Sequence, residues 1–104
     1  MIVDEHIYTF YPGKLEEFLR MYEQEGLEIQ TRILGNLIGY FTTDIGPMNQ
    51  IVHLWGFADY GDREKRRVEL LSNPVWKAYL PKVRALMCNQ ETKMLRPTKF
   101  SPIR

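Results

Sequence analysis

The side chains of this sequence that could carry acid–base or ligand-binding chemistry gather in one short segment. Residues 49–57, NQIVHLWGF, place a histidine and a tryptophan inside an otherwise apolar strand pattern. Because side chains alternate between the two faces of a strand, His53 and Trp55 lie on the same face. An imidazole in such a place needs a hydrogen-bond partner or stays neutral, because burial disfavours its charged form.

Two interpretations of His53 follow from this environment. In the first, it is a pocket acid, base or ligand anchor that works with Trp55 and with an aromatic residue of a neighbouring strand, such as Tyr8 or Tyr40. In the second, it is a core histidine that fixes the strand register or a dimer contact. No sequence spacing attaches a carboxylate to His53, so both interpretations stay open.

A metal site has little support in the sequence. In an antiparallel sheet His6 could neighbour His53, but a third ligand is missing, and no HxE, HxxxH or CxxC spacing is present. The single cysteine, Cys88, is expected at the far end of a helix. We therefore expect no bound cofactor, although heme needs one axial group and leaves His53 or His6 open as a ligand.

Motifs for nucleophilic catalysis and for phosphate binding are absent, since the chain has no GxSxG, GxGxxG or Walker sequence. A cofactor-independent monooxygenase would need mainly an apolar cavity, a polar anchor for the substrate and exclusion of water. Trp55, Trp76, Tyr40 and His53 could line such a cavity, or could form an ordinary core. Trp76 and Tyr79, three apart on a helix, belong to its inward stripe.

The basic run at residues 63–67, REKRR, is most simply a solvated helix face, because acidic residues interrupt it and no aromatic residues are interleaved. Arg66 is a candidate to reach over a pocket mouth and hold a carboxylate by a bidentate pair. The formal net charge of +1 gives no field that would gather nucleic acid or anionic lipid, so neither is expected as a partner.

Periodicity and turn signals predict the elements that must position these side chains. Strand patterns alternate with amphipathic helical stripes, and Pro12-Gly13, Gly35-Asn36 and Asn73-Pro74 mark boundaries. The predicted helices are weakened near Gly26 and bent or restarted at Pro81. The predicted strands cover residues 2–11, 37–43, 49–57 and 90–96, and the predicted helices run from Lys14 to Ile33, from the cap Asp59 to Leu71 and from Asn73-Pro74 to Met87.

This order, strand–helix–strand–strand–helix–strand, predicts an α+β, ferredoxin-like fold with a four-stranded antiparallel sheet in a single domain covering residues 1–104. Its helices cover one face of the sheet only. The other face needs cover, and stacking of two sheets would supply it, so a homodimer is expected. Gly39 and Gly56 within strands suit bulges or close backbone approach.

The chain begins in a strand pattern and contains no apolar run of the roughly 20 residues that span a bilayer. We therefore expect neither secretion nor membrane insertion. A single cysteine suits a reducing compartment, and cytoplasmic localisation is the default expectation.

Several segments resemble the NIPSNAP family of the dimeric α+β barrel superfamily. They are Tyr11 to Leu15, Gly39 to Phe41 followed by Ile45-Gly46-Pro47, Asn49 to Trp55, the arginine-containing helix before Asn73 to Tyr79, and Phe100-Ser101-Pro102. The resemblance covers almost the whole chain and implies a barrel dimer of poorly defined biochemical role. Related barrel families include heme-degrading and cofactor-independent monooxygenases, which is an analogy of fold.

Residues and resemblance together favour a protein that binds a small apolar or aromatic ligand near the central strand. The expected binding residues are His53, Trp55, Tyr8, Tyr40, Trp76 and Arg66, with His53 as a possible catalytic group. The first alternative is a cofactor-independent or heme-related monooxygenase-like enzyme. The second is a protein-interaction module that uses the charged helix.

Overall fold

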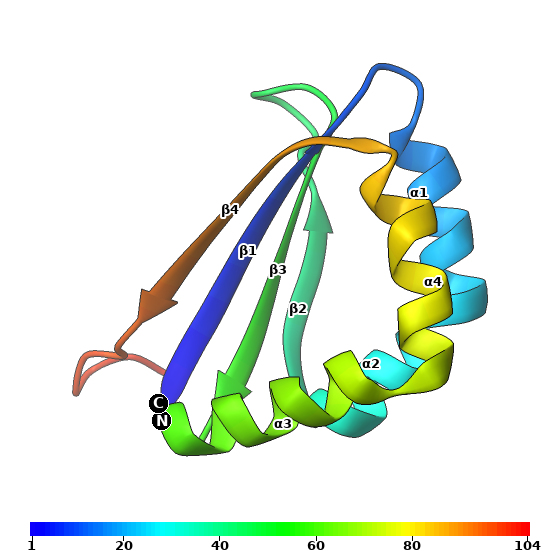
Figure 1. Cartoon of the computed structure of the whole chain (residues 1–104). Coiled ribbons are helices and arrows are strands. Elements are labelled where there is room, and N and C mark those ends of the chain that lie inside the picture. The colour runs from blue at the N-terminus through cyan, green and yellow to red at the C-terminus, as the bar shows by residue number, and fades with distance from the viewer.

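Four antiparallel strands form one sheet in the order β2-β3-β1-β4, and the helices cover one of its faces (Figure 1). The computed structural model describes residues 1–104. The strands are β1 (Ile2–Phe10), β2 (Asn36–Thr42), β3 (Gln50–Phe57) and β4 (Met87–Leu95). This arrangement confirms the predicted ferredoxin-like α+β fold, with β1 and β3 paired at the centre of the sheet and β4 paired with β1 at one edge.

The strand register decides which side chains meet beneath the helices. His6 lies opposite His53, and His53 lies opposite Tyr40, so these three rings form one row across the sheet. Tyr8 lies in the next row, opposite Ile51. The register between β2 and β3 shifts between Leu37 and Gly39, which is the irregularity expected near that glycine.

The first helical segment is interrupted where the sequence predicted weakness. It consists of α1 (Leu15–Met21), a π-helical turn η1 (Tyr22–Gly26) and α2 (Leu27–Leu34). A Cβ atom at Gly26 would lie 2.9 Å from Cζ of Tyr79 and 3.0 Å from Cδ1 of Tyr22. Only glycine lets α4 approach this closely, and single π-helical turns are a common way to fit such an irregularity into a helix.

The second helical segment has two helices, α3 (Tyr60–Ser72) and α4 (Pro74–Arg84). Asp59 caps α3 by accepting a hydrogen bond from the Asp62 amide, and Asn73 caps α4 by accepting from the first amides of that helix. Of the bend or restart predicted at Pro81, the restart does not occur: α4 continues through Pro81 to Arg84. Met87 and Cys88 lie in β4 and not in a helix, because their backbone extends the antiparallel pairing with β1.

The core lies between the sheet and the helices. Its members are apolar side chains from every layer: Ile2, Phe10, Phe18, Tyr22, Ile29, Ile33, Leu34, Ile51, Trp55, Phe57, Leu70, Trp76, Tyr79, Val83 and Leu86. The buried polar side chains are Asp4, Gln30 and His53. None of the helices has the length and apolar character needed to cross a membrane.

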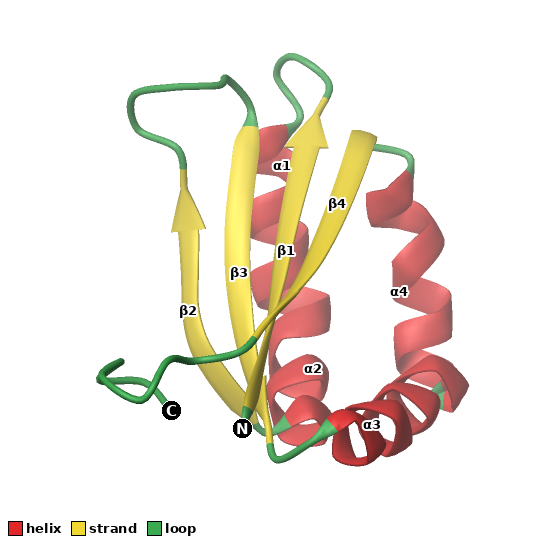
Figure 2. Ribbon diagram, turned by 90° about the vertical axis from the view of Figure 1, so that its left-hand side faces the viewer, coloured by secondary structure: helices red, strands yellow, loops and turns green.

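The other face of the sheet carries no helix (Figure 2). Ile7, Val52 and Leu54 alternate with the core-facing residues and are half-buried, while Phe41 is 54% exposed. The segment after β4 runs across the lower end of this face (Figure 2), where Pro97, Ser101 and Ile103 line a shallow groove with Leu54. This helix-free surface, centred on Ile7, Val52 and Leu54, is called the open face below.

Candidate functional site

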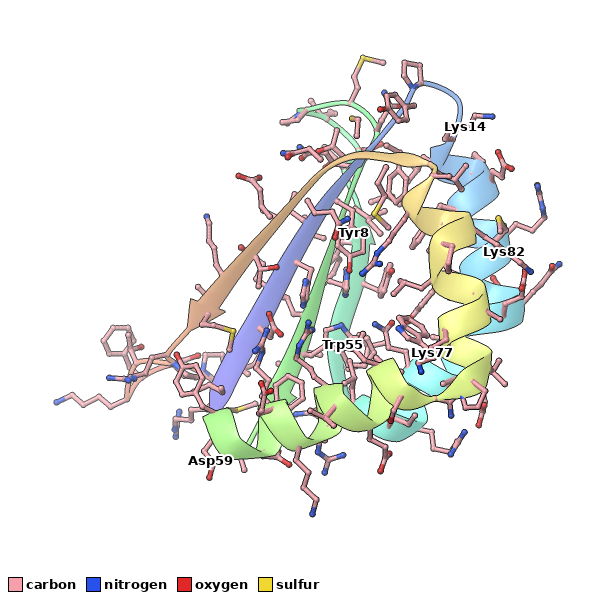
Figure 3. The ribbon with its side chains drawn as sticks, viewed as in Figure 1. Tyr8, Lys14, Trp55, Asp59, Lys77 and Lys82 are labelled. Carbon is pink, nitrogen blue, oxygen red and sulfur yellow. The ribbon has the colours of Figure 1, made fainter.

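A cavity of about 160 Å³ lies between the sheet and the helices. Figure 3 shows Tyr8 projecting from β1 into the space that the helices enclose. An engineered cavity of roughly 150 Å³ holds a benzene-sized molecule, so this cavity suits a ligand of about one ring. The residues that line it are His6, Tyr8, Gln30, Leu34, Arg67, Leu70, Leu71, Trp76, Leu80, Arg84, Met87, Gln90 and Thr92.

His6 belongs to a chain of polar contacts at the wall of this cavity. Its Nε2 atom lies 3.1 Å from Oδ1 of Asp4, and its Nδ1 atom lies 3.2 Å from the Thr92 hydroxyl. The Arg63 Nε donates to Oδ2 of Asp4 at 2.8 Å. Burial raises the pKa of Asp4, but His6 and Arg63 lower it by more, so the carboxyl is ionised at neutral pH. An ionised Asp4 orients the His6 ring and leaves its Nδ1 side toward the cavity.

His53 lies behind His6 and does not line the cavity. It is 1% exposed, and its ring is stacked between His6, with ring centroids 4.9 Å apart, and Tyr40, at 4.6 Å. The Trp55 indole donates a hydrogen bond of 2.7 Å to Nδ1 of His53, which places the imidazole proton on Nε2. Burial, together with the nearby His6, lowers the pKa of His53 to about 3, so the ring is neutral at physiological pH.

The phenols around this stack form a second buried layer. Tyr40 stacks on Tyr22 with ring centroids 4.9 Å apart, and the Tyr22 hydroxyl donates to Oε1 of Gln30 at 2.5 Å. Burial raises the pKa values of Tyr22 and Tyr40 far above that of a free phenol. Burial also raises the pKa of Tyr8 to about 12, although Arg67 and Arg84 act in the opposite direction. All three phenols are therefore protonated at neutral pH, and Tyr22 donates its proton to the Gln30 side chain.

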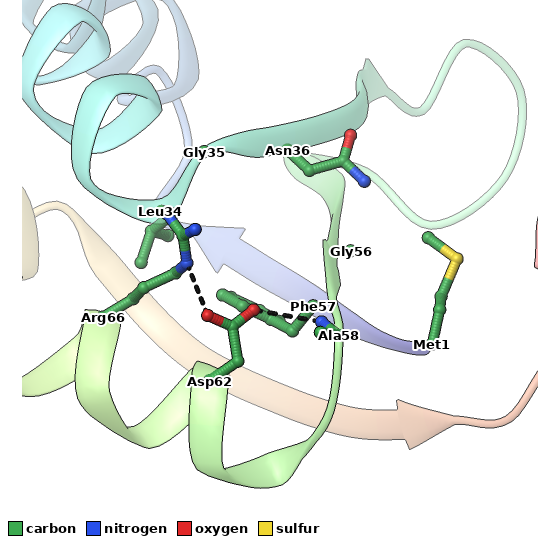
Figure 4. Close-up of a pocket in the computed structure, with 9 residues that line it drawn as sticks. All are labelled: Met1, Leu34, Gly35, Asn36, Gly56, Phe57, Ala58, Asp62 and Arg66. Atoms are coloured by element: carbon green, nitrogen blue, oxygen red, sulfur yellow. Dashed lines mark hydrogen bonds and ion pairs between the residues drawn. The ribbon is translucent and has the colours of Figure 1, made fainter.

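Arg66 lies away from this cavity. Its Nε donates to Oδ1 of Asp62 at 2.8 Å and its Nη1 donates to the Ile33 carbonyl at 3.0 Å. Figure 4 shows Arg66 and Asp62 in a separate, open pocket near Gly35 and Met1. The side chain therefore ties α3 to the C-terminal end of α2.

The structure brings together part of the set of residues that the sequence suggested. Tyr8 and Trp76 line the cavity, while His53, Trp55 and Tyr40 form its buried backing. Two arginines that sequence reasoning did not select, Arg67 and Arg84, also line it. For Arg67 a signal existed, because Leu70 and Leu71 follow at spacings of three and four, which puts all three on one face of α3. His6 lines the cavity too, although the sequence pointed to it only as a metal or heme ligand.

The residues present do not favour a metal ion or heme. No group of three or more histidine, cysteine, aspartate or glutamate side chains is placed to hold a metal. A cavity of about 160 Å³ has room for one ring and not for the four pyrroles of a porphyrin. What the arrangement offers is a chamber of mixed polar and apolar lining, with a histidine–carboxylate pair on one wall and two guanidinium groups.

Comparison with known proteins places this fold and site in context. The family model described as NIPSNAP matches residues 3–102. A protein named "Protein NipSnap homolog" from Dictyostelium discoideum is 33% identical over 93 residues, which are 89% of this chain and 41% of that protein. A putative NipSnap protein from Caenorhabditis elegans is 22% identical over 102 residues, or 98% of this chain and 19% of that protein. The chain thus spans less than half the length of either relative.

Solved structures of NIPSNAP proteins also resemble this chain, over almost its whole length. A NIPSNAP family protein from Agrobacterium tumefaciens is 48% identical, with a TM-score of 0.97 over 99% of this chain and 98% of that one. A NIPSNAP-like domain protein from Burkholderia xenovorans is 49% identical, with a TM-score of 0.93 over 97% of this chain and 88% of that one. An antibiotic biosynthesis monooxygenase, 12% identical with a TM-score of 0.67 over 94% of this chain and 99% of that one, shares the fold alone.

Proposed function

This chain belongs to the NIPSNAP family, and we propose that it binds a small, largely apolar or aromatic molecule in the cavity between β1, β4 and the helices. The observation that carries the proposal is the cavity of about 160 Å³ itself, which is lined by Tyr8, Trp76 and several leucines. Ligand sites are typically concave and apolar with a few polar groups that fix orientation. His6, Gln30 and Thr92 are among the polar groups of this lining.

Native mass spectrometry of the freshly purified protein tests this proposal. The wild type should retain a small molecule that denaturing spectra of the same sample lack. Thr92→Trp should remove the retained mass, because Thr92 lies on the cavity side of β4 and a larger ring there fills the chamber. Lys77→Trp is the matched control, since Lys77 is exposed on α4 outside the lining residues. Equal retention by both variants would place the ligand elsewhere and count against this cavity.

We also propose that a second copy of the chain covers the open face. Ile7, Val52 and Leu54 remain half-buried there. Glu5 and Lys93 lie opposite each other in the register on the same face, so that one patch carries charges of both signs. An apolar centre with both signs of charge is self-complementary, as a two-fold interface requires.

The mass of the particle in solution, measured by light scattering after size exclusion, tests the dimer. Wild type should have the mass of two chains, and Val52→Lys should shift it toward one, because the substitution places a charge in the apolar centre. Val68→Lys is the matched control, since Val68 is 57% exposed on α3. A dimer unchanged by Val52→Lys would exclude this face as the interface.

A second candidate function, acid–base catalysis, is favoured by the contact between His6 and Asp4. A histidine oriented by a carboxylate at the wall of a ligand pocket is a common general base. Such a base would remove a proton from an activated C–H group of the ligand and return one to it. The test is deuterium uptake from heavy water into a cyclic 1,3-diketone. Wild type should accelerate the uptake and His6→Gln should not, whereas equal rates would remove His6 as the base.

A further inference from the structure

We propose that the ligand of this cavity carries a carboxylate, which the guanidinium groups of Arg67 and Arg84 bind. The inference rests on the proposed binding function and specifies the chemical class of the ligand. Arg67 comes from α3 and Arg84 from the last turn of α4, so two different helices bring positive charge to one chamber.

These two arginines differ from their neighbours in lacking an acidic partner. Arg63 pairs with Asp4, Arg66 with Asp62 and Arg32 with Glu28. Neither Arg67 nor Arg84 takes part in any ion pair of the chain. Arg67 is half-buried despite this, and a guanidinium group that is partly removed from water without a partner is costly. Arg84 is exposed, so this cost falls on Arg67, and an anion bound in the chamber would supply the missing partner of Arg67.

The lining contains no group that would repel such an anion. Its charged members are Arg67 and Arg84, with His6 as the remaining titratable group besides Tyr8. The Asp4 carboxylate, which lies behind the wall, is already paired with Arg63 and contacts His6. The phenol of Tyr8 and the side chains of both arginines line the same chamber, and the positive charge of the two arginines opposes the effect of burial on the pKa of Tyr8.

The hydrogen-bond donors, the lining and the volume of the chamber favour a carboxylate over a phosphate. The first amides of α4, those of Val75 and Trp76, already donate to Oδ1 of Asn73, so this helix start offers no free donors. The apolar part of the lining, which includes Leu70, Leu80 and Trp76, suits an apolar body. With a volume of about 160 Å³, the predicted ligand is a single-ring or short-chain acid, whose planar carboxylate matches the guanidinium fork.

Titrations monitored by nitrogen-15 NMR, which observes the Nε–H groups of the two arginines, test the inference. The probes are benzoate, phenylacetate and hexanoate, each paired with its neutral primary amide. We expect at least one acid to bind about tenfold more tightly than its amide and to shift the Nε–H signals of Arg67 and Arg84. Arg67→Gln and Arg84→Gln should each lose that preference. Arg20→Gln, an exposed arginine of α1 without an ion pair, should retain it.

Each other outcome overturns a defined part of the inference. Equal affinity for acid and amide, unaffected by either substitution, would refute the carboxylate and leave small-molecule binding intact. Tighter binding of phenyl phosphate than of benzoate would replace the carboxylate by a phosphate. Failure of every acid and every amide to bind would contradict the ligand class. If the freshly purified protein also retains no molecule in native spectra, the proposed function fails with it.

Discussion

The imidazole rings of His6 and His53 lie stacked, 13° from parallel with centroids 4.9 Å apart, yet only His6 lines the cavity. The two rings are cross-strand partners in the same row of the sheet. His53 is enclosed by Tyr40 on its other side and accepts from Trp55, whereas the side chain of His6 is 13% exposed and contacts Asp4 and Thr92. The two histidines therefore differ in burial: His53 is enclosed in the core, whereas His6 lies at the wall of the cavity.

Replacing His53 by alanine should destabilise the fold. The substitution removes a ring packed between two others and leaves the Trp55 indole without its acceptor. We expect the free energy of unfolding to fall by about 3 kcal/mol, from the cavity and the lost hydrogen bond together. Urea unfolding followed by tryptophan fluorescence measures this change. A loss below about 0.5 kcal/mol would contradict the structural role of His53.

Acidification should destabilise the protein through the same residue. The pKa of His53 is about 3 in the folded chain and ordinarily 6.5, so the unfolded chain binds a proton that the folded chain excludes. This contribution to stability is complete above pH 6.5 and is lost as the pH falls toward 3. Between about pH 7 and about pH 5 the free energy of unfolding should fall by about 2 kcal/mol.

His53→Gln is the control for this pH dependence, because glutamine does not titrate. The variant should show a shallower slope than wild type over the same interval. Asp4 contributes little there, since its pKa is ordinarily 3.8 and is lowered further by folding, so its effect begins only at more acidic pH. An unchanged slope in the variant would mean that another group produces the dependence.

Gly26→Ala should lower stability, although its backbone conformation is open to alanine. The new Cβ would lie 2.9 Å from the ring of Tyr79, so the helices must separate slightly, at a cost of about 1–2 kcal/mol. Gly61→Ala is the matched control, because Gly61 is exposed in the first turn of α3 with its nearest neighbour at 3.4 Å. That change should stabilise by about 0.5 kcal/mol. Thermal melts of both variants would show opposite shifts, and equal shifts would contradict the close approach.

Arg63→Met should be costly because it leaves the Asp4 carboxylate, with a side chain 2% exposed, without its guanidinium partner. We expect a loss of about 3 kcal/mol in the free energy of unfolding, together with greater sensitivity to acid because the pKa of Asp4 would rise. Arg32→Met removes the exposed pair with Glu28 and should cost less than about 0.5 kcal/mol. The free energy of unfolding of both variants is measured by urea denaturation. Similar losses would show that the buried ion pair of Asp4 stabilises the fold no more than an exposed pair does.

The strand and helix patterns predicted the fold because they depend on local physics. Alternation along residues 50–57, the caps Asp59 and Asn73 and the weak point at Gly26 all appear where the sequence placed them. The predicted end of the last helix was wrong by a few residues. Leu86 and Met87 continue the helical spacing, but pairing of β4 with β1, a contact between distant parts of the chain, draws Met87 into the sheet.

For the candidate site, the sequence by itself determined that His53 and Trp55 share one face of their strand, but it left open whether that face meets the helices or a partner chain. The sequence could not determine how deeply each of these side chains is buried. Sheet order and helix placement bury His53 between two rings and leave His6, Arg67 and Arg84 around a chamber. The physical reason is that strand periodicity is a property of neighbouring residues, whereas a cavity exists only where layers from distant segments pack without filling the space between them.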